Sequence, residues 1–136
     1  MPKVLGIDYG NKRVGIAISD SSQFIASALC TISSNDIFKF LTDLLKKEDI
    51  DCIVVGTAKN LDGTETDSSE SINIFVKKLH NTYPKIDIRT IDERFTSKIA
   101  FQSLIDSGIK KKKRRNKGLI DEVSATIILQ DYLSYR

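Results

Sequence analysis

Apolar residues near the N-terminus follow the patterns of paired strands. Val4 to Tyr9 is almost wholly apolar, and the turn Gly10-Asn11-Lys12 leads into Arg13 to Asp20, where valine and isoleucine alternate with smaller residues. A third strand is expected over Ala26 to Ile32. Alternation with a period of two is typical of strands, so this part of the chain predicts a three-strand antiparallel meander.

The remainder of the chain alternates between helical and strand patterns. Cys52 to Gly56 is a short apolar run of the kind found in parallel strands covered on both faces. The other predicted elements are a helix capped by Ser34 or Asn35 and ending near Lys47, a helix that begins at Asp67 or Ser68 and is stopped by Pro84, a strand over Ile86 to Ile91, a helix from about Thr96 to Ser107, and a last helix over Leu119 to Tyr135.

This order predicts one α/β domain over residues 1–136. Strand–helix–strand units require parallel pairing with right-handed crossovers, which adds two parallel strands to the meander. The expected architecture is therefore a mixed five-stranded sheet with helices on both faces. A chain of 136 residues with 40% hydrophobic content is large enough to bury one proper core.

Composition narrows the cellular setting. The sequence has no run of 18 apolar residues and no signal-peptide pattern at Met1, so a soluble, cytoplasmic protein without membrane contact is expected. Cys30 and Cys52 lie in separate apolar runs without metal-ligand spacing, and we interpret them as reduced core residues. His80 lies late in an amphipathic helix, where a packing or surface role is expected.

The positive charge of the chain is concentrated in one segment. Net charge is only +3, but the run from Lys110 to Lys117 (KKKKRRNK) holds seven of the 21 basic residues, so the rest carries 14 basic and 18 acidic residues. A patch of this kind on a mildly acidic body is suited to gripping phosphates without reading bases. The alternative is a solvated loop with no binding role.

Three carboxylates are expected to converge. Asp8 ends an apolar strand between glycines, and Glu93 follows the last predicted strand. The carboxyl ends of parallel strands meet along one edge, where ligands bind open α/β sheets. On the last helix Asp121 shares a stripe with Ala125 and Ile128, which should face the sheet, whereas Glu122 should face water.

Carboxylates held close together repel one another unless a cation or a shared proton relieves the repulsion. Oxygen ligands without cysteine or histidine favour Mg²⁺ or Mn²⁺, and such ions support phosphodiester cleavage by an activated water. Simpler structural roles are also open. Asp8 could cap the following turn, and the helix dipole could stabilise Glu93 and Asp121, each at a helix N-terminus. Thr96 and Ser97 are most simply helix caps.

The same residues carry a family resemblance. Gly6-Ile7-Asp8-Tyr9-Gly10 with Arg13, then Asp92-Glu93-Arg94-Phe95-Thr96-Ser97, then Asp121 with Ala125 and Ile128-Leu129-Gln130 resemble the YqgF-type family over essentially the whole chain. That family is described as Holliday-junction-resolvase-like and as a nuclease for pre-16S ribosomal RNA. The resemblance implies an RNase H-like fold. One departure is Gly56-Thr57-Ala58, where the family usually has Gly-Leu-Pro.

The resemblance also implies residue roles. Asp8, Glu93 and Asp121 correspond to the metal-binding catalytic acids, and Arg13 and Arg94 to motif arginines that contact phosphates or orient the acids. Together with the basic residues Lys110, Lys111, Lys112, Lys113, Arg114 and Arg115, they suggest a metal-dependent endonuclease acting on structured nucleic acid.

Three functional hypotheses follow. The first is a nuclease that processes the 5′ end of pre-16S ribosomal RNA, with resolution of branched DNA as its nearest variant; either a monomer or a homodimer is compatible with the sequence. The second is a nucleic-acid-binding module without catalysis, acting in transcription or ribosome assembly. The third is a phosphotransferase of the actin and sugar-kinase type, which would need two such domains around its nucleotide.

Overall fold

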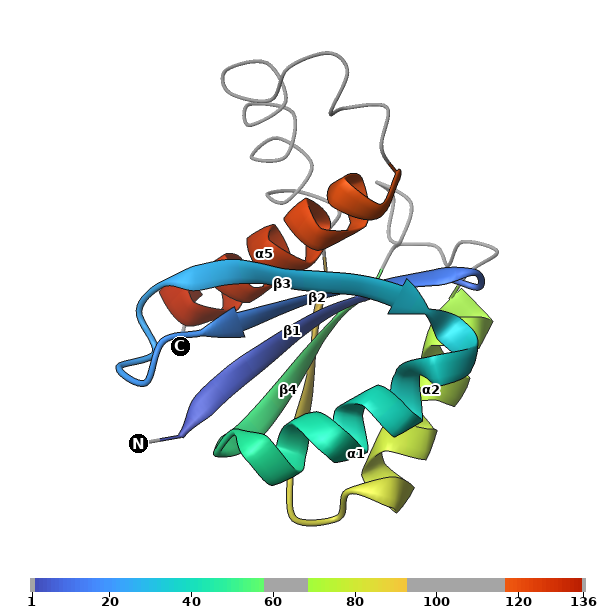
Figure 1. Ribbon diagram of the computed structural model, residues 1–136, viewed down its shortest axis with the longest axis horizontal. Coiled ribbons are helices and arrows are strands. Elements are labelled where there is room, and N and C mark those ends of the chain that lie inside the picture. Colours follow the sequence, from blue (N-terminus) through green and yellow to red (C-terminus); the bar gives the residue numbers. More distant parts are fainter. Residues whose placement is uncertain (1, 58–68, 93–116, 136) are drawn as a thin grey trace.

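The computed structural model describes residues 2–57, 69–92 and 117–135, and its strands form one mixed sheet (Figure 1). The strands in these ranges are β1 (Lys3–Tyr9), β2 (Arg13–Ser19), β3 (Ala26–Ser33), β4 (Ile50–Thr57) and β5 (Asp87–Asp92). Their order across the sheet is β3-β2-β1-β4-β5. Strand β2 pairs antiparallel with β1 and β3, whereas β4 pairs parallel with β1 and β5, so the predicted sheet is confirmed.

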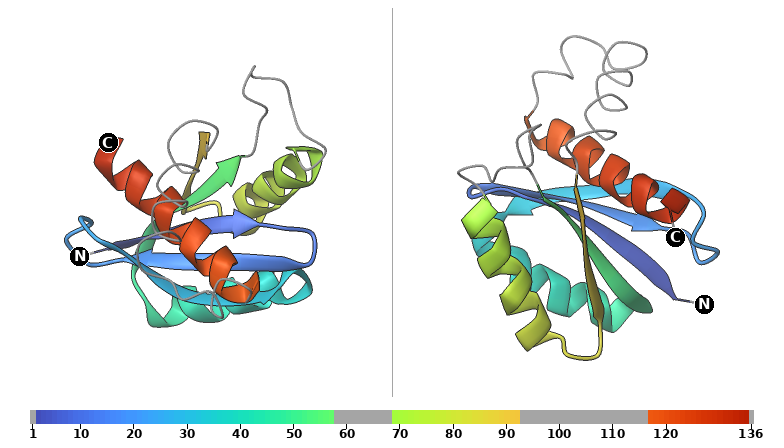
Figure 2. Two further views of the ribbon diagram at one scale, coloured as in Figure 1. Left: turned by 90° about the horizontal axis from the view of Figure 1, so that it is seen from above. Right: turned by 180° about the vertical axis from the view of Figure 1, so that it is seen from behind.

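Helices cover both faces of this sheet. The turn η1 (Ser34–Asp36) leads into α1 (Ile37–Lys47), which lies with α2 (Ser69–Thr82) on one face. Helix α5 (Lys117–Tyr135) crosses the opposite face (Figure 2). The predicted helix over Thr96–Ser107 lies outside the described residues.

The larger core lies between the sheet and the pair α1 and α2. Alternate residues of β1 and β4 meet the apolar stripes of both helices there, and the two strands are buried on both faces, as the apolar run in β4 predicts. Phe75 of α2 stacks on Tyr9 with ring centroids 4.2 Å apart and meets Phe38 edge-on at 5.7 Å. These ring contacts fix the end of β1 against α2.

The second core lies under α5. Ala125, Ile128 and Leu129 of the helix are fully buried against the sheet, together with Val4 and Val54. The predicted stripe of Ala125 and Ile128 therefore does face the sheet. Helix α5 itself starts two residues earlier than the predicted Leu119.

The start of the first helix differs from the prediction. Ser34 and Asn35, the expected caps of a helix, lie inside the turn η1. The hydroxyl of Ser33 caps that turn by accepting the amide of Asn35, and α1 begins after Asp36 without a side-chain cap. The serine-rich sequence signals a helix start, but several adjacent polar residues compete for the same bond.

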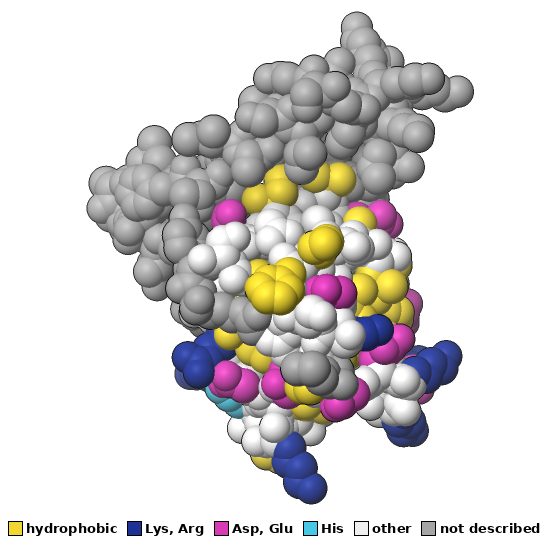
Figure 3. Space-filling view, turned by 90° about the vertical axis from the view of Figure 1, so that its left-hand side faces the viewer, with side chains coloured by type: hydrophobic (Ala, Val, Ile, Leu, Met, Phe, Trp, Pro, Cys, Tyr) yellow, Lys and Arg dark blue, Asp and Glu magenta, His cyan; other side chains and the backbone are white. Residues whose placement is uncertain are grey.

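The turn between β2 and β3 closes the end of the sheet that lies near both termini. The carboxylate of Asp20 accepts the amides of Phe24 and Ile25, and these bonds, led by that of Ile25, lower the pKa of Asp20. Gln23 adopts a positive φ of 60° in this turn. Phe24 is 73% exposed, and Figure 3 shows hydrophobic side chains open to solvent on this side.

Within the described ranges, no helix is long and apolar enough to cross a membrane.

Candidate functional site

Asp8 lies at the carboxyl end of the central strand, on the face that α5 covers. Leu5 and Ile7 pack in the α1–α2 core, whereas Val4 packs under α5, and side chains alternate along a strand. Asp8 therefore projects to the same side as Val4 and Gly6. It is half-buried, so its carboxylate is partly withdrawn from water rather than sealed in the core.

Glycines occupy the positions beside Asp8 on both neighbouring strands. Asp8 pairs directly with Gly15 of β2. On the other side, one residue beyond the Ile7–Val55 pair, the parallel register sets Asp8 beside Gly56 of β4. Neither glycine carries a side chain on this face.

Helix α5 carries the backbone of Asp121 toward the same end of the sheet. The helix meets β1 at Gly6, where an added Cβ would lie 2.6 Å from Leu129 Cβ and 2.9 Å from the Ala125 carbonyl oxygen. Asp8 lies two residues beyond Gly6, and Asp121 lies about one helical turn before Ala125. Because α5 starts at the end of the sheet where β1 finishes (Figure 1), both aspartate positions lie toward that end. The side chain of Asp121 is outside the described part of the structure.

Strand β5 leads toward the third predicted acid. It ends at Asp92, which pairs with Thr57 at the end of β4. Glu93, the next residue in the sequence, lies outside the described residues, as do Arg94 and the basic residues 110–115. Their predicted roles are therefore not tested by the structure. Within the described ranges, no three histidine, cysteine, aspartate or glutamate side chains group together as a metal site.

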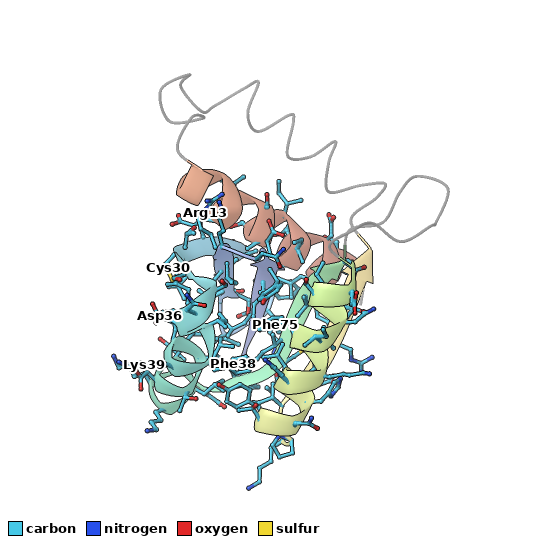
Figure 4. The ribbon with its side chains drawn as sticks, turned by 90° about the vertical axis from the view of Figure 1, so that its right-hand side faces the viewer. Arg13, Cys30, Asp36, Phe38, Lys39 and Phe75 are labelled. Carbon is cyan, nitrogen blue, oxygen red and sulfur yellow. The ribbon has the colours of Figure 1, made fainter. Side chains whose placement is uncertain are left out.

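Arg13 lies on the same face as Asp8, at the start of β2. It is two residues from Gly15 and therefore in phase with it, and its side chain is half-buried. Figure 4 shows Arg13 on the α5 side of the sheet, with Phe38 and Phe75 on the opposite side. The turn before it is closed by the amide of Gly10, which donates to the Arg13 carbonyl oxygen at 2.9 Å. The structure thus brings one predicted arginine to the end of the sheet that holds Asp8.

The side of α5 that carries Glu122 and Gln130 lies partly against β3. Gln130 accepts the amide of Ala26 at 3.0 Å and donates to the Phe24 carbonyl oxygen at 3.0 Å, which ties the helix to the start of the edge strand β3. Glu122 is half-buried, and its charge adds to burial in raising the pKa of Cys30. The expectation that Glu122 faces open water is therefore wrong in part, because β3 lies alongside this side of α5.

Sequence reasoning missed some residues that shape this end of the sheet. Gly15 and Gly56 were not singled out as the neighbours of Asp8, although each stands in a strand pattern where a glycine indicates close approach. The sequence predicts Ser34 or Asn35 as a helix cap, but the hydroxyl of Ser34 donates to the Asn11 carbonyl oxygen in the turn before Arg13. Only strand register and the fold connect these residues.

The strand order β3-β2-β1-β4-β5, with helices on both faces of the sheet, defines an RNase H-like α/β protein. Its candidate site is the carboxyl end of the central strand, where Asp8 lies half-buried. The chain belongs to the family described as "RuvX: Holliday junction resolvase", whose model matches residues 2–135. The chain is 52% identical over 134 residues to a protein of Flavobacterium psychrophilum named "Putative pre-16S rRNA nuclease", with 98% of both chains covered. A protein of the same name from Bacteroides fragilis is 41% identical over 133 residues, covering 98% of this chain and 96% of that protein.

Solved structures agree with the fold. A structure of Thermus thermophilus RuvC with a Holliday junction substrate matches with a TM-score of 0.59, covering 99% of this chain and 98% of that one at 12% identity. The fowlpox virus Holliday junction resolvase matches with a TM-score of 0.59, covering 98% and 99% of the two chains at 11% identity. At these identities the likeness establishes the shared fold.

Proposed function

We propose that this protein is a divalent-metal-dependent endonuclease that hydrolyses phosphodiesters of structured nucleic acid in the cytoplasm, with the 5′ end of pre-16S ribosomal RNA as its main substrate. The family match over residues 2–135 and the relatives named for pre-16S rRNA support the reaction and the substrate. The observation that carries the proposal is the place of Asp8, half-buried at the carboxyl end of the central strand between two glycine positions.

In this proposal Asp8, Glu93 and Asp121 together hold Mg²⁺ or Mn²⁺. The part of this set that the structure describes fits the ion: Asp8 offers carboxylate oxygens at a partly solvated strand end, and hard divalent cations prefer oxygen ligands. When bound, such an ion lowers the pKa of a coordinated water and stabilises the leaving oxygen. Arg13, on the same face as Asp8, contacts a substrate phosphate, because its guanidinium fork suits two phosphate oxygens.

The residues Lys110 to Arg115 and Arg94 extend this phosphate-binding surface. The six cations from Lys110 to Arg115 stand just before α5, the helix that carries Asp121, and Lys117 is the first residue of that helix. Their contribution is electrostatic, so it supplies affinity without sequence readout.

Resolution of branched DNA is the second candidate, and the family description favours it. Symmetric cleavage of a four-way junction needs two active sites, and a homodimer would supply them. A monomer is sufficient for cleavage of one RNA strand. The two candidates therefore differ in oligomeric state as well as in substrate.

The substrate is tested by offering the purified protein a 5′-extended 16S rRNA fragment and a four-way DNA junction, each with Mn²⁺, with Mg²⁺ and with EDTA. We expect metal-dependent cleavage of the RNA at a defined position and slower or no cleavage of the junction. If the protein cleaves the junction in preference to the RNA, with paired cuts, the resolvase candidate replaces the RNA nuclease. Salt-sensitive binding to both without cleavage of either would favour the non-catalytic binding module.

A further inference from the structure

The turn between β1 and β2 is fastened to a second turn that is distant in the sequence. The amide of Ser34 donates to the Lys12 carbonyl oxygen at 3.0 Å, and its hydroxyl donates to the Asn11 carbonyl oxygen at 2.5 Å. Next to these bonds, Arg13 pairs with Ser33 across β2 and β3. One serine of η1 therefore holds two consecutive carbonyl groups of the turn that leads into Arg13.

The two adjacent serines make different contacts. The hydroxyl of Ser33 makes a local bond: it accepts the amide of Asn35, two residues further along in η1, at 3.3 Å. The hydroxyl of Ser34 instead reaches across to Asn11, 23 residues away. A local helix-cap role accounts for Ser33 and leaves the cross-turn bond of Ser34 unexplained.

We propose that Ser34 is a positioning residue: by holding the turn before β2, it fixes Arg13 on the Asp8 face for contact with a substrate phosphate. This inference rests on the proposed function, because it takes nucleic acid as the ligand of Arg13. Asn11 and Lys12 are exposed at the turn, so little packing holds them, and a hydrogen bond has a correspondingly large share in ordering the backbone. Ordering the turn before substrate arrives removes an entropic cost from binding.

The position of the turn supports this role. Gly10 and Arg13 close the turn through one backbone bond of 2.9 Å, and Asp8 lies two residues before Gly10. Displacement of the turn would therefore move Arg13 relative to Asp8, while the core beneath β1 and β2 remains in place. Loss of the Ser34 hydroxyl should weaken substrate contact more than it lowers stability.

The test measures affinity for a fluorescent 5′-extended 16S rRNA fragment, with a four-way DNA junction as a second probe, in EDTA so that nothing is cleaved. The full-length variants are Ser34→Ala, Ser34→Thr, Ser33→Ala, Arg13→Gln and the double variant Ser34→Ala with Arg13→Gln. We expect Ser34→Ala to raise Kd about three- to tenfold, in line with the loss of one hydrogen bond. Ser34→Thr, which keeps the hydroxyl, should restore Kd, and Ser33→Ala should leave it nearly unchanged.

The double variant decides whether Ser34 acts through Arg13. Once Arg13→Gln has removed the phosphate contact, Ser34→Ala should add no further loss of affinity. Additive losses, equal losses from the two serine variants, or no binding of either probe by the wild type would overturn the proposal. Wild-type protein that cleaves neither probe in Mn²⁺ or Mg²⁺ but shows the expected coupling in EDTA would contradict the nuclease function and leave the role of Ser34 intact.

Discussion

Gly6 controls how closely the helix carrying Asp121 approaches the strand carrying Asp8. The residue has no Cβ, and this absence allows the backbone of α5 to lie directly on β1. The sequence predicts a strand and a helix here, and it marks Gly6 only as a neighbour of Asp8. The contact is between segments more than 100 residues apart, so no local pattern reveals it.

Gly6→Ala is expected to destabilise the protein by about 1 to 3 kcal/mol, the usual cost of overpacking a tight core. The added methyl would lie 2.6 Å from Leu129 Cβ and 2.9 Å from a backbone oxygen, which a side-chain rotation cannot relieve. Urea unfolding measures the loss, and Ser27→Ala on the exposed edge of β3 is the control. Equal stability of the two variants would show that α5 does not pack closely on Gly6.

Cys52 predicts a pH dependence of folding stability. Burial raises the pKa of its thiol to about 11 from an ordinary value of 9.0, against a smaller lowering by the hydrogen bond to Tyr132. The unfolded chain therefore loses this proton at lower pH than the folded protein does, so the contribution is present below pH 9.0 and is lost as pH rises toward about 11. Urea unfolding at several pH values should show a steeper decline for wild type than for Cys52→Ala. The same slope in both proteins would contradict the burial of this thiol.

The elements of the sheet and its helices follow closely from the periodicity of apolar residues. Within the described residues, the five strands and their parallel or antiparallel sense are as predicted, because each strand is flanked by a clear turn or helix pattern. The start of α1 is not as predicted, since Ser33, Ser34 and Asn35 are all plausible caps and only the contact with the distant turn separates their roles. Element boundaries that depend on tertiary contacts are beyond local reasoning.

The junction of α2 with β1 depends on Phe75. Its ring stacks on Tyr9 and meets Phe38 edge-on, and only 2% of its surface is exposed. Phe75→Ala should cost about 3 to 5 kcal/mol in urea unfolding, as truncation of a buried aromatic residue usually does. Ile74→Ala is the matched control, because the neighbouring Ile74 is 50% exposed and should lose much less. Similar losses from both variants would show that the stack does not anchor α2.

The fold brings the carboxyl ends of the parallel strands and the start of α5 to one end of the sheet, and the basic residues 110–115 stand in the sequence between β5 and α5. The convergence of Asp8 with the strand ends could be argued from strand order alone. Completion of the set by Glu93 and Asp121 remains a prediction, because side-chain positions at a loop edge depend on contacts that periodicity does not encode.

The basic run should supply most of the salt-dependent affinity. Replacing four of the cations between Lys110 and Arg115 with glutamine should weaken binding to every nucleic acid tested, since phosphate contacts do not distinguish sequences. The slope of log K against log salt should fall by about 0.9 for each lost contact on a duplex, and by about 0.7 on a single strand. Fluorescence titrations at several salt concentrations measure it. An unchanged slope would show that these residues do not touch phosphates.

The central claim is that Asp8 is a metal-binding catalytic acid, and the most direct measurement compares cleavage of the 5′-extended 16S rRNA fragment by wild type, Asp8→Asn and Asp43→Asn in Mn²⁺. Asp43 is an exposed aspartate on α1, which covers the face of the sheet opposite α5, and its variant makes the same change in charge. We expect Asp8→Asn to bind the fragment and to lose cleavage by at least about a hundredfold, as loss of a principal catalytic group does. Asp43→Asn should cleave like wild type. Cleavage by Asp8→Asn at the wild-type rate, persisting in EDTA, would contradict the account.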